Sequence, residues 1–399
     1  MDASIAAPRQ DMKVLSLVCG GHFMSHFYMM VLPPLFPFLN RDLGLSFTEL
    51  AFLLTSRYVA TGVAQVPIGF LVDRFGAKVM LVIGLMMTVL GYALFALASD
   101  FWLLFLFVVL GGIGDSVFHP ADYAILNGSV SKAKMGRAFS VHTFSGHIGF
   151  AIGPAVIPFL AVATNWRTAM LVAALFGFAV TVLLLSQWGA LKEDPHQGKK
   201  KQKDDKSGGI STLLTRPVML LFFFFAISTL AGNGISGFSI AALTQLQSVP
   251  DAFVGVPLTA FMLSSAFAVL AGGFIADWDI RHDLIAALGF LAAAVVIFSI
   301  AAVPMPFIVL VIAFGVAGFC LGVIRPARDL MVRDVAPPGS SGKVFGFVFS
   351  GQNVGGAIAP PIYGLVVDYA DPHWVFYMSA AFLVFGILTV VGGRKLIGA

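Results

Sequence analysis

The chain has 399 residues, of which 58% are hydrophobic and 11% are charged, and its formal net charge is +4. Because roughly a quarter of the residues in a soluble domain are charged, this composition excludes an ordinary soluble protein and indicates lipid as the solvent. The small positive charge gives no indication of nucleic-acid binding.

Twelve mostly apolar runs follow one another along the chain, and each is long enough to cross a bilayer as a helix. They lack the alternating pattern of β-barrel strands, so spanning helices are predicted. The runs cover residues 14–39, 47–72, 79–98, 101–129, 137–163, 168–190, 217–248, 255–276, 283–302, 305–335, 342–369 and 373–393.

The placement of Lys and Arg predicts the orientation of these helices. With the N-terminus inside, only Arg41 and Arg167 fall in external loops, so both termini are expected in the cytoplasm. The first run is too long for a signal peptide and is expected to remain as a helix.

One long polar segment divides the chain. It follows the sixth run and contains "LKEDPHQGKKKQKDDKSGG", which predicts a cytoplasmic linker. We therefore expect an N-terminal six-helix bundle over 1–190, a linker over 191–216 and a second six-helix bundle over 217–399.

The two halves resemble each other in sequence. Residues 118–154 align with 324–360 without a gap, so that Pro120 meets Pro326 and Gly149 meets Gly355. Duplicated six-helix halves are typical of one large class of transporters.

Short motifs carry a resemblance to a known family. "GFLVDRFGAK" (69–78) resembles the loop signature of the major facilitator superfamily, and "GFAIGP" (149–154) partly resembles a motif of its antiporter branches. "GDSVFHPADYAIL" (114–126) resembles the fourth span of the fosmidomycin-resistance-like branch. The resemblance implies twelve helices in two pseudo-symmetric bundles, with the first, fourth, seventh and tenth spans around a central cavity.

A first set of polar residues falls near the middle of the predicted spans. Such groups are costly in a bilayer and commonly mark substrate or ion paths. Arg57 could pair with a carboxylate or phosphonate of a substrate; the alternative is that it pairs with a helix carbonyl or an internal acid. The candidate substrate-binding residues are His26, Arg57, Asp115, His147, Asn233, Gln352 and Asn353.

A second set lies nearer the cytoplasm and is the candidate for proton coupling. Spacings of four and three place Asp115, His119 and Asp122 on one helix face, and histidine titrates near neutral pH. The alternative is a static hydrogen-bonded network, which we favour for His142. The candidate coupling residues are Asp115, His119, Asp122, Arg325, Arg328 and Asp329.

Histidines also raise the question of a metal. His22 and His26 have a spacing seen in metal ligands, but they lack the Glu of a His-Glu-x-x-His motif and no third ligand is evident. Neither a metal site nor a cofactor is predicted.

The loop after the second span suggests a gate. The resemblance implies that Asp73, with Arg74 and Lys78, caps the eleventh span near Gly342 and latches one conformation. Asp277 is the degenerate copy in the second half.

These observations predict a secondary transporter of the bacterial inner membrane, expected as a monomer, whose partners are lipid, protons and a small organic solute. Proton-coupled export is favoured; the alternatives are proton-coupled uptake of an organic acid and a passive facilitator. The sequence shows no Walker motif, which argues against ATP-driven transport. It also shows no catalytic constellation, so an enzyme is not predicted.

Overall fold

The computed structural model describes residues 3–130, 135–191, 213–246, 249–276, 281–336 and 341–394. Almost all of these residues are helical, and the described ranges contain no strand. The predicted linker 191–216 and the gate residue Asp277 fall largely or wholly outside these ranges. The chain divides into two compact units, one of Met1–Leu45 and Ser56–Lys201 and one of Ser46–Thr55 and Gln202–Ala399.

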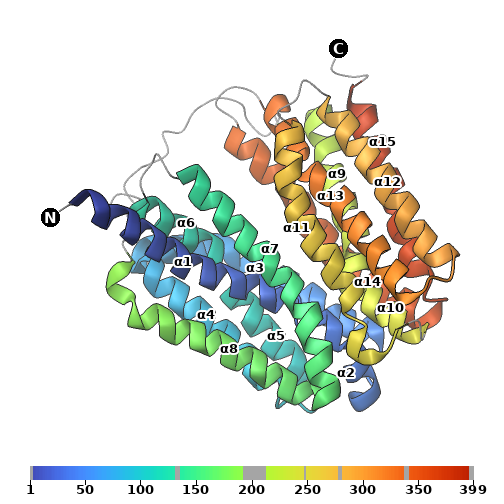
Figure 1. Cartoon of the computed structure of the whole chain (residues 1–399), viewed down its shortest axis with the longest axis horizontal. Coiled ribbons are helices and arrows are strands. Elements are labelled where there is room, and N and C mark those ends of the chain that lie inside the picture. Colours follow the sequence, from blue (N-terminus) through green and yellow to red (C-terminus); the bar gives the residue numbers. More distant parts are fainter. Residues whose placement is uncertain are drawn as a thin grey trace. The chain divides into compact units, whose positions relative to one another are not determined.

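The helices follow one another in chain order (Figure 1). Up to residue 190 they are α1 (Ala3–Met29), η1 (Pro33–Leu35), α2 (Phe36–Leu43), α3 (Phe47–Phe75), α4 (Ala77–Phe95), α5 (Phe101–Asp115), α6 (Phe118–Ser129), α7 (Met135–Ala163), α8 (Trp166–Ser186) and η3 (Trp188–Ala190). After the predicted linker they are α9 (Arg216–Asn233), η6 (Gly234–Phe238), α10 (Ser239–Gln245), η7 (Asp251–Phe253), α11 (Val256–Ala276), α12 (His282–Ala302), α13 (Phe307–Val335), α14 (Ser341–Tyr369) and α15 (Trp374–Arg394).

The helices confirm a multi-pass membrane protein. Within the described ranges, nine helical segments are long and apolar enough to cross a membrane, and Trp374–Val390 is a shorter apolar helix. The predicted runs 47–72 and 342–369 overlap α3 and α14, each of 29 residues. Every predicted apolar run therefore overlaps a helix.

Four of the predicted runs are not single α-helices, and one of them, 168–190, passes from α8 into the 3₁₀ turn η3. The run 14–39 is interrupted after Met29 and continues through the 3₁₀ turn η1 into α2. The run 217–248 contains a π-helical turn, η6, between α9 and α10. The run 101–129 breaks between α5 and α6, because Pro120 has no N–H to donate to the carbonyl of Ser116 one turn earlier.

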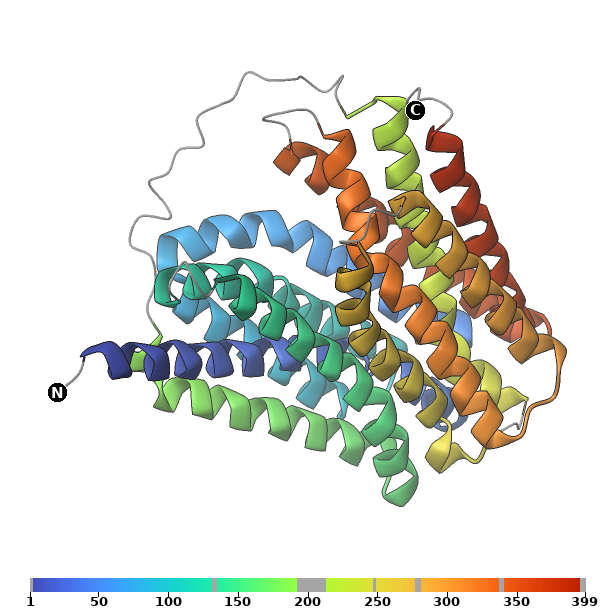
Figure 2. The ribbon, with the colours of Figure 1, turned by 45° about the horizontal axis from the view of Figure 1, so that its top comes forward.

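Small residues let the helices of the N-terminal unit approach closely. A side chain at Gly112 would lie 3.0 Å from the carbonyl oxygen of Arg57, and one at Gly114 would lie 2.6 Å from the carbonyl oxygen of Gly84. These contacts press α5 against α3 and α4, as small residues do in membrane helix pairs. α1 contacts α6, α7 and α8 (Figure 1, Figure 2).

A carboxylate caps the first turn of α3 within the second unit. Asp368 of α14 accepts hydrogen bonds from the backbone N–H groups of Phe47 at 2.8 Å and Thr48 at 2.7 Å, and from the Thr48 hydroxyl at 2.6 Å. The cap satisfies backbone donors that a helix start leaves unpaired. This contact explains why Ser46–Thr55 is grouped with the C-terminal helices.

Candidate functional site

The N-terminal unit contains a buried ion pair between α3 and α5. Arg57 Nη2 lies 3.1 Å from Asp115 Oδ2, and the two residues are 4% and 8% exposed. Ser25 of α1 donates its hydroxyl to Asp115 Oδ1 at 2.6 Å. Charged side chains that are buried in this way are expensive to desolvate, and a direct partner for each charge offsets part of that cost.

The close contact of α3 with α5 holds this pair together. Thr61 donates its hydroxyl to the carbonyl oxygen of Gly112 at 2.9 Å, one turn from Arg57 on the same helix. The missing side chain of Gly112 lets the α3 backbone come near enough for Arg57 to reach Asp115. The phenols of Tyr58 and Tyr92 interact electrostatically with the pair.

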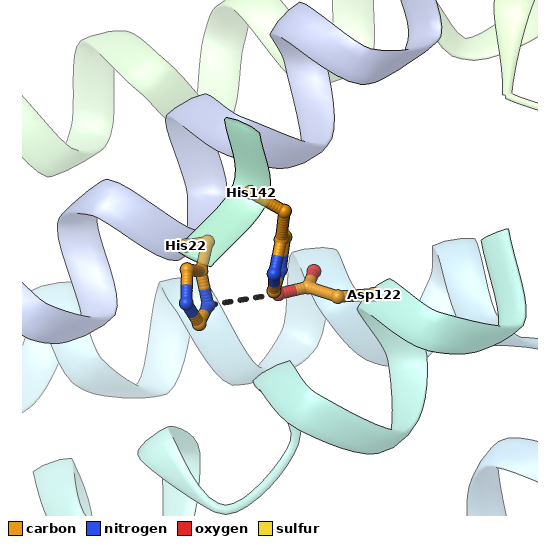
Figure 3. Close-up of side chains that lie close together, drawn as sticks. All are labelled: His22, Asp122 and His142. Atoms are coloured by element: carbon orange, nitrogen blue, oxygen red, sulfur yellow. Dashed lines mark hydrogen bonds and ion pairs between the residues drawn. The ribbon is translucent and has the colours of Figure 1, made fainter. Parts of the chain in front are cut away.

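A second buried carboxylate, Asp122 of α6, lies between two imidazoles. Its Oδ2 atom is 3.0 Å from His142 Nε2 of α7 and 3.2 Å from His22 Nδ1 of α1. Figure 3 shows both rings turned toward this carboxylate. The two imidazoles stack on each other with a centroid distance of 3.7 Å. We call these three residues the Asp122 cluster.

Two more of the predicted substrate residues, one on α1 and one on α7, lie near the ring of Phe150. The ring of His26 is 4.2 Å from that of Phe150, and the ring of His147 is 6.2 Å from the same phenyl group. His147 Nδ1 lies 2.9 Å from the carbonyl oxygen of Thr143. Of the four candidates in this unit, Arg57 thus pairs with Asp115, while His26 and His147 flank Phe150.

The three candidates spaced along one helix face do not meet. Asp115 turns to Arg57, Asp122 turns to His22 and His142, and His119 is exposed, with its ring 5.3 Å from that of His22. Among the described residues, His119 forms no ion pair with either acid. The spacing argument assumed one continuous helix, whereas α5 ends at Asp115 and α6 begins at Phe118.

Some candidates of the second unit have partners within their own helix. Asn233 is buried and donates to the carbonyl oxygen of Thr229 at 3.0 Å, whereas Gln352 is half-buried and Asn353 exposed. Arg328 pairs with its neighbour Asp329 at 3.1 Å.

Arg328 also packs its guanidinium over the ring of Phe225 at 4.2 Å, and Arg325 is half-buried. The expected pairing of these residues across the sequence repeat stays a prediction.

The gate residues lie at the α3–α4 connection. Asp73 and Arg74 are exposed, Arg74 lies over the ring of Phe75 at 5.3 Å, and Lys78 lies over the ring of Trp188 at 4.9 Å. The latch role of Asp73 stays a prediction.

Sequence reasoning missed His22 and Ser25 as members of these sites. Both lie on α1, near the predicted His26, and contact acids on other helices. The cluster of three polar residues within five positions, 22–26, was the available signal, but it did not indicate their partners.

A bundle of apolar helices with charged groups paired inside it is typical of polytopic transport proteins. The chain belongs to the Major Facilitator Superfamily, whose model matches residues 18–249 and 221–395. It is 23% identical over 394 residues to a fosmidomycin resistance protein of Escherichia coli (strain K12), covering 97% of this chain and 94% of the relative. It is 25% identical over 345 residues to the multidrug resistance protein MdtH of Enterobacter sp. (strain 638), covering 82% and 79% of the two chains.

Solved structures show the same fold. A bacterial homologue of the human lysosomal transporter Spinster, in an inward-facing and occupied conformation, matches with a TM-score of 0.80 at 14% identity, covering 96% of this chain and 97% of that one. A variant of the nucleoside transporter NupG matches with a TM-score of 0.79 at 14% identity, covering 95% and 99%. At this identity the likeness concerns the fold.

Proposed function

We propose that this protein is a proton-coupled secondary transporter that moves a small organic solute across the inner membrane by alternating access. The observation that carries the proposal is the buried pair of Arg57 and Asp115, joined by Ser25. A carboxylate that faces a permanent cation can release the cation when it is protonated, which links proton binding to a change of partners. We further propose that both termini lie in the cytoplasm, which the distribution of Lys and Arg supports.

Export in exchange for protons is the favoured direction. A solute that donates hydrogen bonds or carries positive charge would compete with the proton for Asp115, so that one leaves as the other binds. The motif "GFAIGP" and the relatives named for fosmidomycin and multidrug resistance support this direction.

Uptake of an organic acid with protons is the second candidate, and Arg57 favours it. An anionic solute needs the guanidinium free, and Asp115 releases it only when neutral. Proton and anion would then bind together. Around this pair, His26, His147, Asn233, Gln352 and Asn353 are proposed to contact the solute, and Asp73 to control access.

The test is transport into liposomes under proton gradients of opposite sign. The solute panel starts with fosmidomycin and includes simple carboxylates, phosphonates and organic cations. Accumulation with an acidic interior indicates exchange for protons, and accumulation with an acidic exterior indicates cotransport. A rate that ignores both gradients would identify a passive facilitator and contradict proton coupling.

The first prediction concerns Asp115. We expect Asp115→Asn to abolish accumulation driven by a proton gradient, because an amide cannot exchange the proton. Solute exchange without a gradient is expected to persist, since the amide keeps the size of the side chain and one of its two acceptor oxygens. The exposed Asp371→Asn is the matched control and should accumulate solute normally. Accumulation by Asp115→Asn at the wild-type level would show that coupling resides elsewhere.

A further inference from the structure

We propose that the Asp122 cluster is a binding site for a divalent first-row transition ion, with Zn²⁺ as its reference ligand. His22, Asp122 and His142 come from α1, α6 and α7, and each offers one ligand atom; the three atoms lie within 4.8 Å of one another. All three residues are at most 3% exposed. Two imidazole nitrogens and one carboxylate oxygen form a donor set that suits Zn²⁺ and its neighbours.

The separations between ligand atoms fit a tetrahedral ion. Bonds of about 2.1 Å to such an ion place neighbouring ligand atoms about 3.4 Å apart. The two separations to Asp122 Oδ2 are 3.0 Å from His142 Nε2 and 3.2 Å from His22 Nδ1. Two of the three separations thus lie near the tetrahedral value, and the third is at most 4.8 Å.

The cluster also has polar atoms that its protein partners leave unsatisfied. Among the described residues, Asp122 Oδ1 has no hydrogen-bond partner, although the residue is fully buried. His22 Nδ1 lies near Asp122 Oδ2 but not in hydrogen-bonding geometry. Unsatisfied buried groups in a native structure commonly mark the place of a bound ion or water.

One divalent ion fits the arrangement of charges around Asp122 better than protonation of both imidazoles does. The rings of His22 and His142 are stacked at 3.7 Å with an interplanar angle of 24°, so two positive rings would place like charges in contact. As neutral metal ligands, both imidazoles turn a lone pair toward one shared cation. The alternative occupant is one shared proton, and the experiment below separates the two.

A glycine and two further histidines adjoin the cluster. Gly146 of α7 faces the rings, and a side chain there would lie 2.7 Å from His26 and 2.8 Å from His22. His119 is exposed, and its ring lies 5.3 Å from that of His22. His119 and His26 are thus placed to pass an ion inward or to complete the coordination as a fourth ligand.

The experiment is direct metal binding to the untagged full-length protein in detergent, measured by equilibrium dialysis with Zn²⁺. We expect about one high-affinity Zn²⁺ per chain, and at least a tenfold weaker affinity in Asp122→Asn and in His142→Gln. Zn²⁺ is also expected to raise the Tm of the wild type and not that of Asp122→Asn. The matched control is His373→Gln, which removes an exposed histidine that faces Asp371 and should bind as the wild type does.

X-ray absorption of the Zn²⁺-loaded wild type decides the case even if a variant fails to fold. Nitrogen and oxygen neighbours at about 2.0–2.1 Å with the scattering of at least two imidazoles are expected. An all-oxygen shell, a stoichiometry near zero, or equal affinity in His142→Gln and His373→Gln would overturn the metal site and leave a shared proton. Because the Arg57–Asp115 pair is not involved and no transport is measured, either result leaves the proposed function standing.

Discussion

Two buried carboxylates of the N-terminal unit, Asp115 and Asp122, have partners of different chemistry. Asp115 faces a guanidinium, which is always charged, while Asp122 faces two imidazoles, which can be neutral ligands. Replacing the acid removes an internal counter-charge in the first case and a ligand in the second. At the scale of single residues, we therefore propose that Asp115 serves proton coupling and that Asp122 serves cation binding.

The geometry of Arg57 leads to the second prediction. If the guanidinium contacts an anionic solute, Arg57→Lys should slow the transport of anionic solutes at least tenfold more than that of neutral ones. The lysine keeps the positive charge beside Asp115 but lacks the planar fork that binds a carboxylate with two hydrogen bonds.

Initial rates in liposomes measure this effect, and the exposed Arg41→Lys is the control. Equal slowing of anionic and neutral solutes would mean that Arg57 serves only as the partner of Asp115.

At the scale of helices, two glycines related by the internal repeat perform the same packing role. A side chain at Gly149 of α7 would overlap the carbonyl oxygen of Phe23 on α1, and one at Gly355 of α14 would overlap that of Ala226 on α9. The pairs α1–α7 and α9–α14 are the corresponding contacts of the two units. Similar sequence has thus produced the same close helix approach twice.

The third prediction follows from this packing. Gly149→Ala and Gly355→Ala should each destabilise the protein by about 1–3 kcal/mol, because a methyl group would force two backbones apart. Gly346→Ala, on α14 with nothing within 4 Å of the added carbon, should be neutral or slightly stabilising, since alanine favours helix over glycine. Thermal unfolding in detergent measures all three. A lower Tm for Gly346→Ala than for Gly355→Ala would contradict the packing argument.

At the scale of the whole molecule, alternating access requires contacts that exist in one state and not in another. The exposed Asp73, in the loop that resembles the family signature, is the sequence-based candidate for such a contact. A carboxylate placed at a helix start interacts favourably with the helix dipole, and a neutral amide loses most of that attraction.

The fourth prediction tests this role. Asp73→Asn should reduce the transport rate while the protein remains folded and inserted, and cysteine probes on the cytoplasmic side should become more accessible. Asp42→Asn is the control, because Asp42 is a partly exposed acid paired with its neighbour Arg41. Unchanged transport together with unchanged labelling would exclude a latch at Asp73.

The sequence by itself determined the membrane class, the helices and the family. Each of these depends on local composition, because a bilayer requires continuous apolar helices wherever the chain crosses it. The sequence also located most of the polar residues inside the spans, since charge is rare there and stands out.

Only the tertiary structure decided which of those residues are partners. Ser25 and Asp115 are 90 positions apart, and His142 and Asp122 belong to different helices. Spacing along one helix predicted a shared face for Asp115, His119 and Asp122, but the break before Phe118 changes the direction of the side chains that follow it. Helix rotation, and with it every contact between helices, is set by packing among residues far apart in the chain, and the periodicity of one segment contains no information about its neighbours.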